Sequence, residues 1–343
     1  TWASINRAMI IFVEPVTSIV KDARAVTLPS SGSAAITNAY TGVVANSTGY
    51  DAYIIGNFPS TWAVGTMKGK NLSMLTFTAP AATNYNGGAH FDSGSTGYGE
   101  VEDIFVAKQS NVVVNADENN THESAFALTR INSLFRVRID AKTNAAITKN
   151  DKIDFANPTA MVSIRRIATD YVLTGSTTYP IQPSGTATSP GTYSFANATK
   201  ALNVFFKADA MKDANPTSDT HSNSTTILNG NITFWNEYKI FPAGSNASGT
   251  GSGLNKFDIV LSAVTTDATY IPTGHTAAVP AGTRIYWNGQ IQNAVGPNQI
   301  LELNIMLETA GTTTLPPVGA YGNLEINVSI SQWGDINSSY LPM

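Results

Sequence analysis

The chain has 343 residues and not one cysteine. This absence excludes disulfides, a thiol nucleophile and any thiolate-ligated metal site. Charged residues are also scarce, at 13% of the chain, against about a quarter in an average globular protein. The net charge of −4 comes without a basic stripe or a run of like charges, which argues against nucleic acid as a partner. No apolar run approaches the ~20 residues that a membrane-spanning helix needs.

Recognisable catalytic motifs are missing as well. The four histidines, at positions 90, 122, 221 and 275, stand in polar, loop-like contexts and not at metal-ligand spacing. The sequence has no nucleophile elbow, no HExxH and no phosphate-binding Walker pattern,. We therefore predict no catalytic residue, no metal site and no cofactor, and expect that the chain is not an enzyme. A secreted β-sandwich hydrolase is the least favoured reading.

What the chain does contain favours a folded β protein. Hydrophobic residues make up 42% of the sequence, which is enough for a packed core. Its polar residues are mostly Thr, Ser and Asn, a composition that suits a β-rich extracellular protein. Tyr50, Tyr85, Tyr98 and Trp235 stand near glycine-containing turns. They could form an exposed binding surface or simply cover the edges of a core.

Short apolar or alternating runs predict many β-strands separated by Gly, Pro and Asn turns. In the first half they cover residues 5–14, 51–59, 71–80, 111–116 and 125–143. In the second half they cover residues 158–168, 227–236, 237–243, 257–265, 283–289 and 298–309. Two segments, 65–72 and 197–213, could hold short helices. This pattern predicts an all-β fold of antiparallel sheets packed as sandwiches.

The length is comfortable for two domains. A polar stretch without apolar periodicity, residues 141–152, is the natural place for a boundary. We predict an N-terminal sandwich over residues 1–145 and a C-terminal sandwich over residues 146–309. Residues 310–343 would form a linker and an additional strand.

The end of the chain carries its cleanest strand pattern. Leu324, Ile326, Val328 and Ile330 alternate with polar residues, so one face of this strand is meant to be buried. Residues 308–322, which include a diproline, read as a flexible linker before it. From the sequence alone, the strand could fold back on its own domain, pair with a neighbouring molecule or hang free.

Several stretches resemble the fimbrillin family, the fimbrial subunits of type V pili of Bacteroidales. "SINRAMIIFVEP" and "YDAYIIGNFP" resemble the opening strands of the family's N-terminal domain. "FALTRINSLFRVRIDA" resembles its L-x-R-x-x-A strand, with Leu128 and Arg130 matching and Ser133 in the place of alanine. "NQILELNIMLETAG" and "LEINVSISQW" resemble its last body strand and its closing strand, with Trp333 in place. These matches follow the family's order along the chain.

The resemblance implies two transthyretin-like, Greek-key sandwiches in tandem and a C-terminal extension strand. It implies polymerisation by strand addition, in which the donor strand of one subunit (Leu324, Ile326, Val328, Ile330 and Trp333) fills a groove in the N-terminal domain of the next. The first strand of that acceptor domain would carry Ile5, Met9, Ile11 and Val13. Thr1 would be the first residue left after an arginine-specific protease removes a leader and a preceding strand.

The same resemblance implies export through the outer membrane as a lipoprotein precursor and a final place in a cell-surface fimbria. The partners would be other copies of the chain or related pilus subunits, the maturation protease, and a host protein or glycan as adhesion ligand. An alternative function is that of an adhesin, at the cell surface or at a pilus tip, that binds a glycan or a protein.

Overall fold

The computed structural model confirms an all-β fold. Helical structure among the described residues is limited to short 3-10 turns, such as Val64–Thr66 and Leu72–Met74. Within that part of the chain, no helix is long and apolar enough to cross a membrane. The structure describes residues 4–28, 40–80, 101–117, 125–141, 152–154, 161–165, 170–174, 177–178, 201–205, 232–242, 257–291, 293, 295–307, 309–316 and 324–333.

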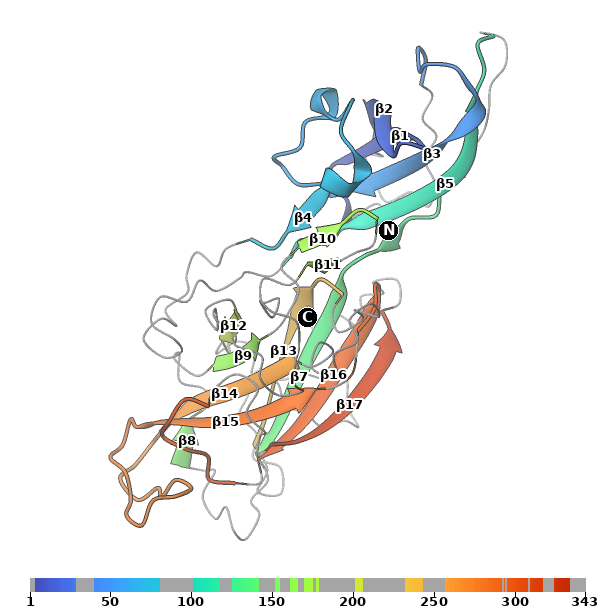
Figure 1. Ribbon diagram of the computed structural model, residues 1–343. Coiled ribbons are helices and arrows are strands. Elements are labelled where there is room, and N and C mark those ends of the chain that lie inside the picture. Colours follow the sequence, from blue (N-terminus) through green and yellow to red (C-terminus); the bar gives the residue numbers. More distant parts are fainter. Residues whose placement is uncertain are drawn as a thin grey trace, which may run out of the picture.

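The first sheet has five strands, with antiparallel pairing between neighbours. In spatial order they are β2 (Ile19–Ala25), β1 (Ala8–Glu14), β3 (Asn46–Gly56), β5 (Phe105–Val114) and β6 (Thr129–Arg130). A small sheet lies against it (Figure 1) and consists of β11 (Thr177–Thr178), β10 (Asp170–Val172) and β4 (Thr76–Thr78).

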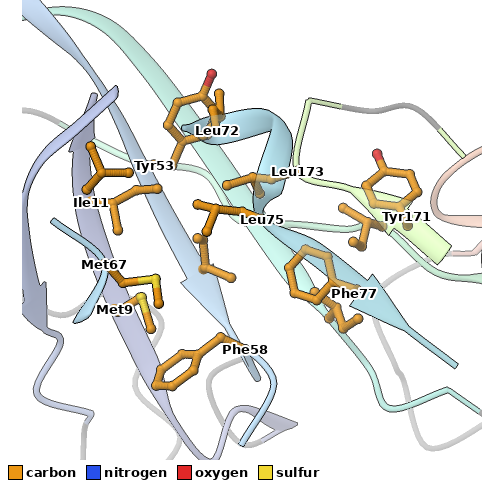
Figure 2. Close-up of a cluster of buried hydrophobic side chains, with 14 of the residues drawn as sticks. Met9, Ile11, Tyr53, Phe58, Met67, Leu72, Leu75, Phe77, Tyr171 and Leu173 are labelled. Atoms are coloured by element: carbon orange, nitrogen blue, oxygen red, sulfur yellow. The ribbon is translucent and has the colours of Figure 1, made fainter. Parts of the chain in front are cut away.

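Strand β1 is buried on both faces from Ala8 to Val13, which explains why these six residues are all apolar and do not alternate. Met9, Ile11 and Val13 enter the core shared with β4 and β10 (Figure 2). Ile10 and Phe12 enter a second cluster on the opposite face of the sheet. Because β1 pairs with β2 on one side and β3 on the other, neither of its edges is open.

The other two sheets form the second part of the molecule. One contains β13 (Ile232–Ile240), β7 (Ser133–Ala141), β16 (Gln299–Leu307) and β17 (Leu324–Gln332). The other contains β12 (Ala201–Phe205), β9 (Met161–Arg165), β14 (Phe257–Thr265) and β15 (Arg284–Ile291), with β8 (Ile153–Asp154) added to β14. All these pairs are antiparallel except β7 and β16, which run parallel.

Alternation along β16 fixes the inner face of its sheet. Leu301, Leu303, Ile305 and Leu307 are all buried, as the period-two pattern predicts,. The facing sheet contributes equally buried side chains, with Trp287 of β15 the largest of them. β15 also contacts β17, although the two strands belong to different sheets. The two sheets therefore enclose a common core.

Strand pairing crosses the boundary predicted between residues 145 and 146. β7 lies before that boundary but pairs with β13 and β16, whereas β10 lies after it but pairs with β4. The division into two domains and an extension stays a prediction, but β7 and β10 each pair with strands on the other side of the predicted boundary. The helix considered for residues 197–213 is wrong, because Ala201–Phe205 is a strand paired with β9.

Candidate functional site

The terminal strand β17 folds back on its own chain. It pairs with β16 in an antiparallel ladder that runs from Leu307 opposite Leu324 to Gln299 opposite Gln332. β16 is also paired with β7, so β17 is the last strand of its sheet. Among the described residues no strand lies along its outer edge. Of the three conformations that the sequence left open, the structure therefore has the first.

The apolar face of β17 is only partly covered in this position. Ile326 and Val328 are half-buried, and Ile330 is 43% exposed. The polar neighbours Ser329 and Ser331 are exposed. Glu325 is the only charged residue of the strand. An edge strand with a partly exposed apolar row and little charge is a template for pairing with another strand.

Trp333, directly after β17, is in contrast buried, and it packs with Leu134 and Ile300. Its backbone N–H donates a hydrogen bond of 2.7 Å to the carbonyl of Asn298. Its ring lies 4.0 Å from the guanidinium carbon of Arg130, on β6 of the first sheet. The strand is thus held more firmly at its end than along its apolar face.

The segment before β17 is not the uniformly flexible linker expected over residues 308–322. Thr312 and Tyr286 of β15 exchange backbone hydrogen bonds of 2.8 and 2.9 Å. The Tyr270 hydroxyl donates to the carbonyl of Ala310, and the Trp287 indole N–H donates to that of Thr309, both at 2.8 Å. Burial raises the pKa of Tyr270,. The expectation of a flexible linker is therefore wrong for residues 309–313, which are anchored on β15 and on the segment around Tyr270 and His275.

The first sandwich carries a groove of about 680 Å³ beside β4. Within the described part of the chain, β4 pairs only with β10, so its other edge carries no strand. Apolar side chains of Phe77, Val101, Ile104 and Phe241 contribute to the lining, and Arg7, Glu102 and Lys239 add charge. Phe241 also stacks on Tyr171, at 6.1 Å between ring centroids, and burial raises the pKa of Tyr171,.

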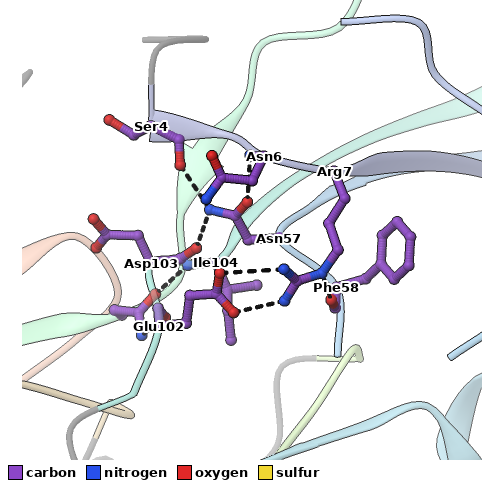
Figure 3. A network of polar contacts seen from close by, with 9 residues as sticks. Ser4, Asn6, Arg7, Asn57, Phe58, Glu102, Asp103 and Ile104 are labelled. Carbon is purple, nitrogen blue, oxygen red and sulfur yellow. Dashed lines mark hydrogen bonds and ion pairs between the residues drawn. The ribbon is translucent and has the colours of Figure 1, made fainter. Parts of the chain in front are cut away.

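A polar network holds the groove wall formed by residues 101–104 (Figure 3). The buried Asn57 amide donates to the carbonyls of Ser4 and Asp103, each at 2.7 Å, and accepts a bond of 2.8 Å from the Asn6 backbone N–H. Arg7 forms an ion pair of 2.6 Å with Glu102. These contacts tie the wall to the start of β1.

A second buried amide supports the same wall. The Asn132 side chain accepts a bond of 2.6 Å from the Ile104 N–H and donates one of 2.9 Å to the Glu102 carbonyl. Neither asparagine stands out in the sequence. The groove itself was missed because its lining comes from segments that are far apart along the chain.

The residues predicted for the acceptor strand do not share one surface. Met9, Ile11 and Val13 belong to the core between the first two sheets, and Ile5 belongs to the cluster on the opposite face. None of them lines the groove beside β4. Thr1 lies outside the described residues. The donor and acceptor roles of the named residues stay predictions.

Of the two roles left open for the aromatic residues near turns, Tyr50 has the one of covering the core. This side chain is buried, and its hydroxyl donates to the carbonyl of Val44 at 3.0 Å. Tyr85 and Tyr98 lie outside the described residues, and Trp235 lies on β13. Nor do His, Cys, Asp and Glu residues in the described part of the chain gather into a group of three that could hold a metal ion.

Comparisons with known proteins identify the fold but not a family. No family model and no curated protein matches the sequence. A solved structure from Bacteroides eggerthii, of a candidate cell adhesion protein, aligns over 96% of this chain and 89% of its own at 15% identity, with a TM-score of 0.51. This chain has the same overall fold.

Two other solved structures are similar at lower TM-scores. One is a candidate cell adhesion protein from Parabacteroides distasonis, with 11% identity, coverage of 97% and 89%, and a TM-score of 0.49. The other is the tip fimbrial protein Mfa3 from Porphyromonas gingivalis, with 12% identity, coverage of 96% and 94%, and a TM-score of 0.37.

Proposed function

We propose that this chain is a structural, non-catalytic subunit of a cell-surface fimbria that supports adhesion. In this proposal β17 of one copy leaves β16 and enters the groove beside β4 of the next copy. The observation that carries it is the pair of incomplete elements, an edge strand with Ile330 43% exposed and a groove lined by β4, whose second edge carries no strand among the described residues. The fold shared with the Bacteroides eggerthii protein and the resemblance to fimbrillins support the same role.

The two elements are chemically complementary. A strand placed along β4 would satisfy backbone groups of Thr76–Thr78 that face the groove. Its apolar side chains, Ile326, Val328 and Ile330, would meet the apolar lining made by Phe77, Ile104 and Phe241. Alternation would leave the serines of β17 on the opposite face.

The energetic gain from this transfer is modest. Full burial of an aliphatic side chain contributes ~1.5–3 kcal/mol. Because Ile326 and Val328 are already half-buried and Ile330 is partly covered, the three together gain roughly 2–4 kcal/mol. Backbone hydrogen bonds to β16 are exchanged for bonds to a neighbour and largely cancel. A durable fimbria would then depend on slow withdrawal of the strand.

The anchored segment limits the distance between copies. If residues 309–313 keep these contacts, the connection from Thr313 to Leu324 spans at most about 35–40 Å when fully extended. Successive copies must therefore pack closely. Maturation by an arginine-specific protease, export as a lipoprotein precursor and a host protein or glycan ligand belong to the same proposal and rest on the sequence resemblance.

The experiment compares two substitutions at adjacent positions of β17. Ile330→Lys places a charge on the apolar face, where the monomer tolerates it because the side chain is 43% exposed. Ser329→Lys places the same charge on the opposite, exposed face. We expect filaments in negative-stain electron microscopy from the parent chain and from Ser329→Lys, and none from Ile330→Lys.

A variant without residues 318–343 should remain folded by circular dichroism and should also form no filaments. Filaments from this truncated chain, or from Ile330→Lys at the parent level, would refute strand addition by β17. Loss of filaments in Ser329→Lys alone would refute the assignment of the inserted face.

A further inference from the structure

The indole of Trp333 packs on Leu134 and Ile300 of its own sheet and also contacts the first sheet. The Arg130 guanidinium lies 4.0 Å from the centroid of the Trp333 ring and 5.1 Å from that of Phe105. Arg130 is in β6 and Phe105 in β5. The contact therefore connects the end of the terminal strand to the first sandwich.

Arg130 is held in place by charge. Its side chain is 4% exposed and forms an ion pair of 3.2 Å with Asp103, which also lies 3.5 Å from the Lys239 ammonium. A buried guanidinium attracts an aromatic ring more strongly than an exposed one, because water does not compete for the charge. The site offers Trp333 an oriented cation in a desolvated setting.

The backbone of Trp333 is held at the same place. Its N–H donates to the Asn298 carbonyl at 2.7 Å, and the Asn298 N–H donates to the Asn132 carbonyl at 2.9 Å. Three residues earlier, Ile330 is 43% exposed. If β17 separated from β16 beginning at Leu324, the strand would still be retained at Trp333.

We propose that Arg130, Asp103 and Phe105 form a docking site for Trp333 that latches β17 to its own chain and controls the release of the strand. The consequence for assembly rests on the function proposed above. The latch itself is a property of the single chain and can be tested without filaments.

The test is amide hydrogen exchange of the full chain, measured by mass spectrometry on peptides from β17 and from β14. Trp333→Leu keeps an apolar side chain but removes the cation–π contact. Losing a desolvated contact of this kind should speed exchange in β17 by roughly 30-fold. Exchange in β14 should stay at the parent level.

Two further variants separate the latch from general packing. Arg130→Lys keeps a cation near Asp103 but loses the planar group that stacks on both rings, so it should also speed exchange in β17. In the double variant with Trp333→Leu, Arg130→Lys should speed exchange in β17 by a smaller factor than it does alone, because both substitutions remove the same contact. Trp62→Leu, which alters a tryptophan that packs on Phe77 at 5.0 Å, should leave exchange in β17 unchanged.

Unchanged exchange in β17 of Trp333→Leu would overturn the latch. An equal increase in β14 would also overturn it, because the effect would then be global destabilisation. Filament growth gives an independent readout, and faster growth of Arg130→Lys, which leaves the donor strand intact, in light scattering supports the latch. If neither parent nor variant forms filaments while β17 of Trp333→Leu exchanges faster, the proposed function fails and the latch stands.

Discussion

Replacing Gly311 with alanine should destabilise the protein strongly, because this glycine lies where the anchored segment crosses β15. Its φ is +62°, a conformation that alanine adopts only at a cost. A Cβ atom there would lie 2.5 Å from Ile285 Cγ2, 2.7 Å from Trp287 Cε2 and 2.7 Å from the Tyr286 carbonyl oxygen. Ile285 and Trp287 are fully buried, and the oxygen is backbone, so none of these atoms can move away cheaply.

The magnitude follows from two contributions. The left-handed conformation costs about 1–2 kcal/mol for alanine, and overpacking of a tight core typically costs about 1–3 kcal/mol. Gly311→Ala should therefore lower the free energy of unfolding by roughly 2–5 kcal/mol. Gly274→Ala is the matched control. Its φ of +82° is also left-handed, but nothing lies within 4 Å of the added Cβ, so only the first contribution applies.

The assay is urea unfolding followed by tryptophan fluorescence, with the midpoint and slope compared among the parent and both variants. Gly311→Ala should unfold at a clearly lower urea concentration than Gly274→Ala. Equal losses in the two variants would show that the segment around Gly311 does not press on β15. The argument for a short, anchored connection to β17 would then fail.

Two further predictions concern buried polar groups. Asn132→Ala leaves the Ile104 N–H and the Glu102 carbonyl without their side-chain partner in a fully buried position. The free energy of unfolding, measured in urea, should fall by about 2–4 kcal/mol. A fall below about 1 kcal/mol would contradict this role of Asn132. Burial raises the pKa of Tyr270, so the folded chain keeps the phenol proton that the unfolded chain loses near pH 10. The contribution of Tyr270 to stability is therefore full below that pH and is lost as the pH rises. Thermal unfolding between pH 8 and 11 should show a shallower decline for Tyr270→Phe than for the parent, and identical slopes would refute this.

Local patterns predicted the strands well where one face of a sheet is buried. The alternation of Leu301, Leu303 and Ile305 identified both β16 and its inner face. Strand β1 was also recognised, but its two buried faces could not be read from an uninterrupted apolar run. The pattern of β17 correctly indicated a strand, yet it carries no information about which partner strand lies beside it.

The parts that could not be predicted depend on contacts between distant residues. Thr78 and Asp170 are opposite each other in β4 and β10, although a predicted domain boundary separates them in the sequence. The groove beside β4 combines residues from around positions 59, 77, 102 and 240. The docking site of Trp333 requires Arg130 and Asp103 to be brought together by the fold, and no local pattern indicates this.

The most direct test of the central claim uses engineered cysteines, because the chain has none of its own. Thr76→Cys places a thiol on β4 in the groove lining, and Ser329→Cys places one on the serine face of β17, which in the inserted strand shares the Thr76 face because side chains alternate along β4,. The control pair combines Ser329→Cys with Val16→Cys, whose site is 93% exposed in the turn between β1 and β2.

Filaments are assembled under reducing conditions, oxidised, and run on a non-reducing denaturing gel. Strand addition predicts a ladder of dimers, trimers and longer covalent oligomers from the Thr76 pair and monomers from the Val16 pair. Filaments of the Thr76 pair that dissolve into monomers, or equal ladders from both pairs, would contradict the insertion of β17 beside β4 of a neighbouring copy.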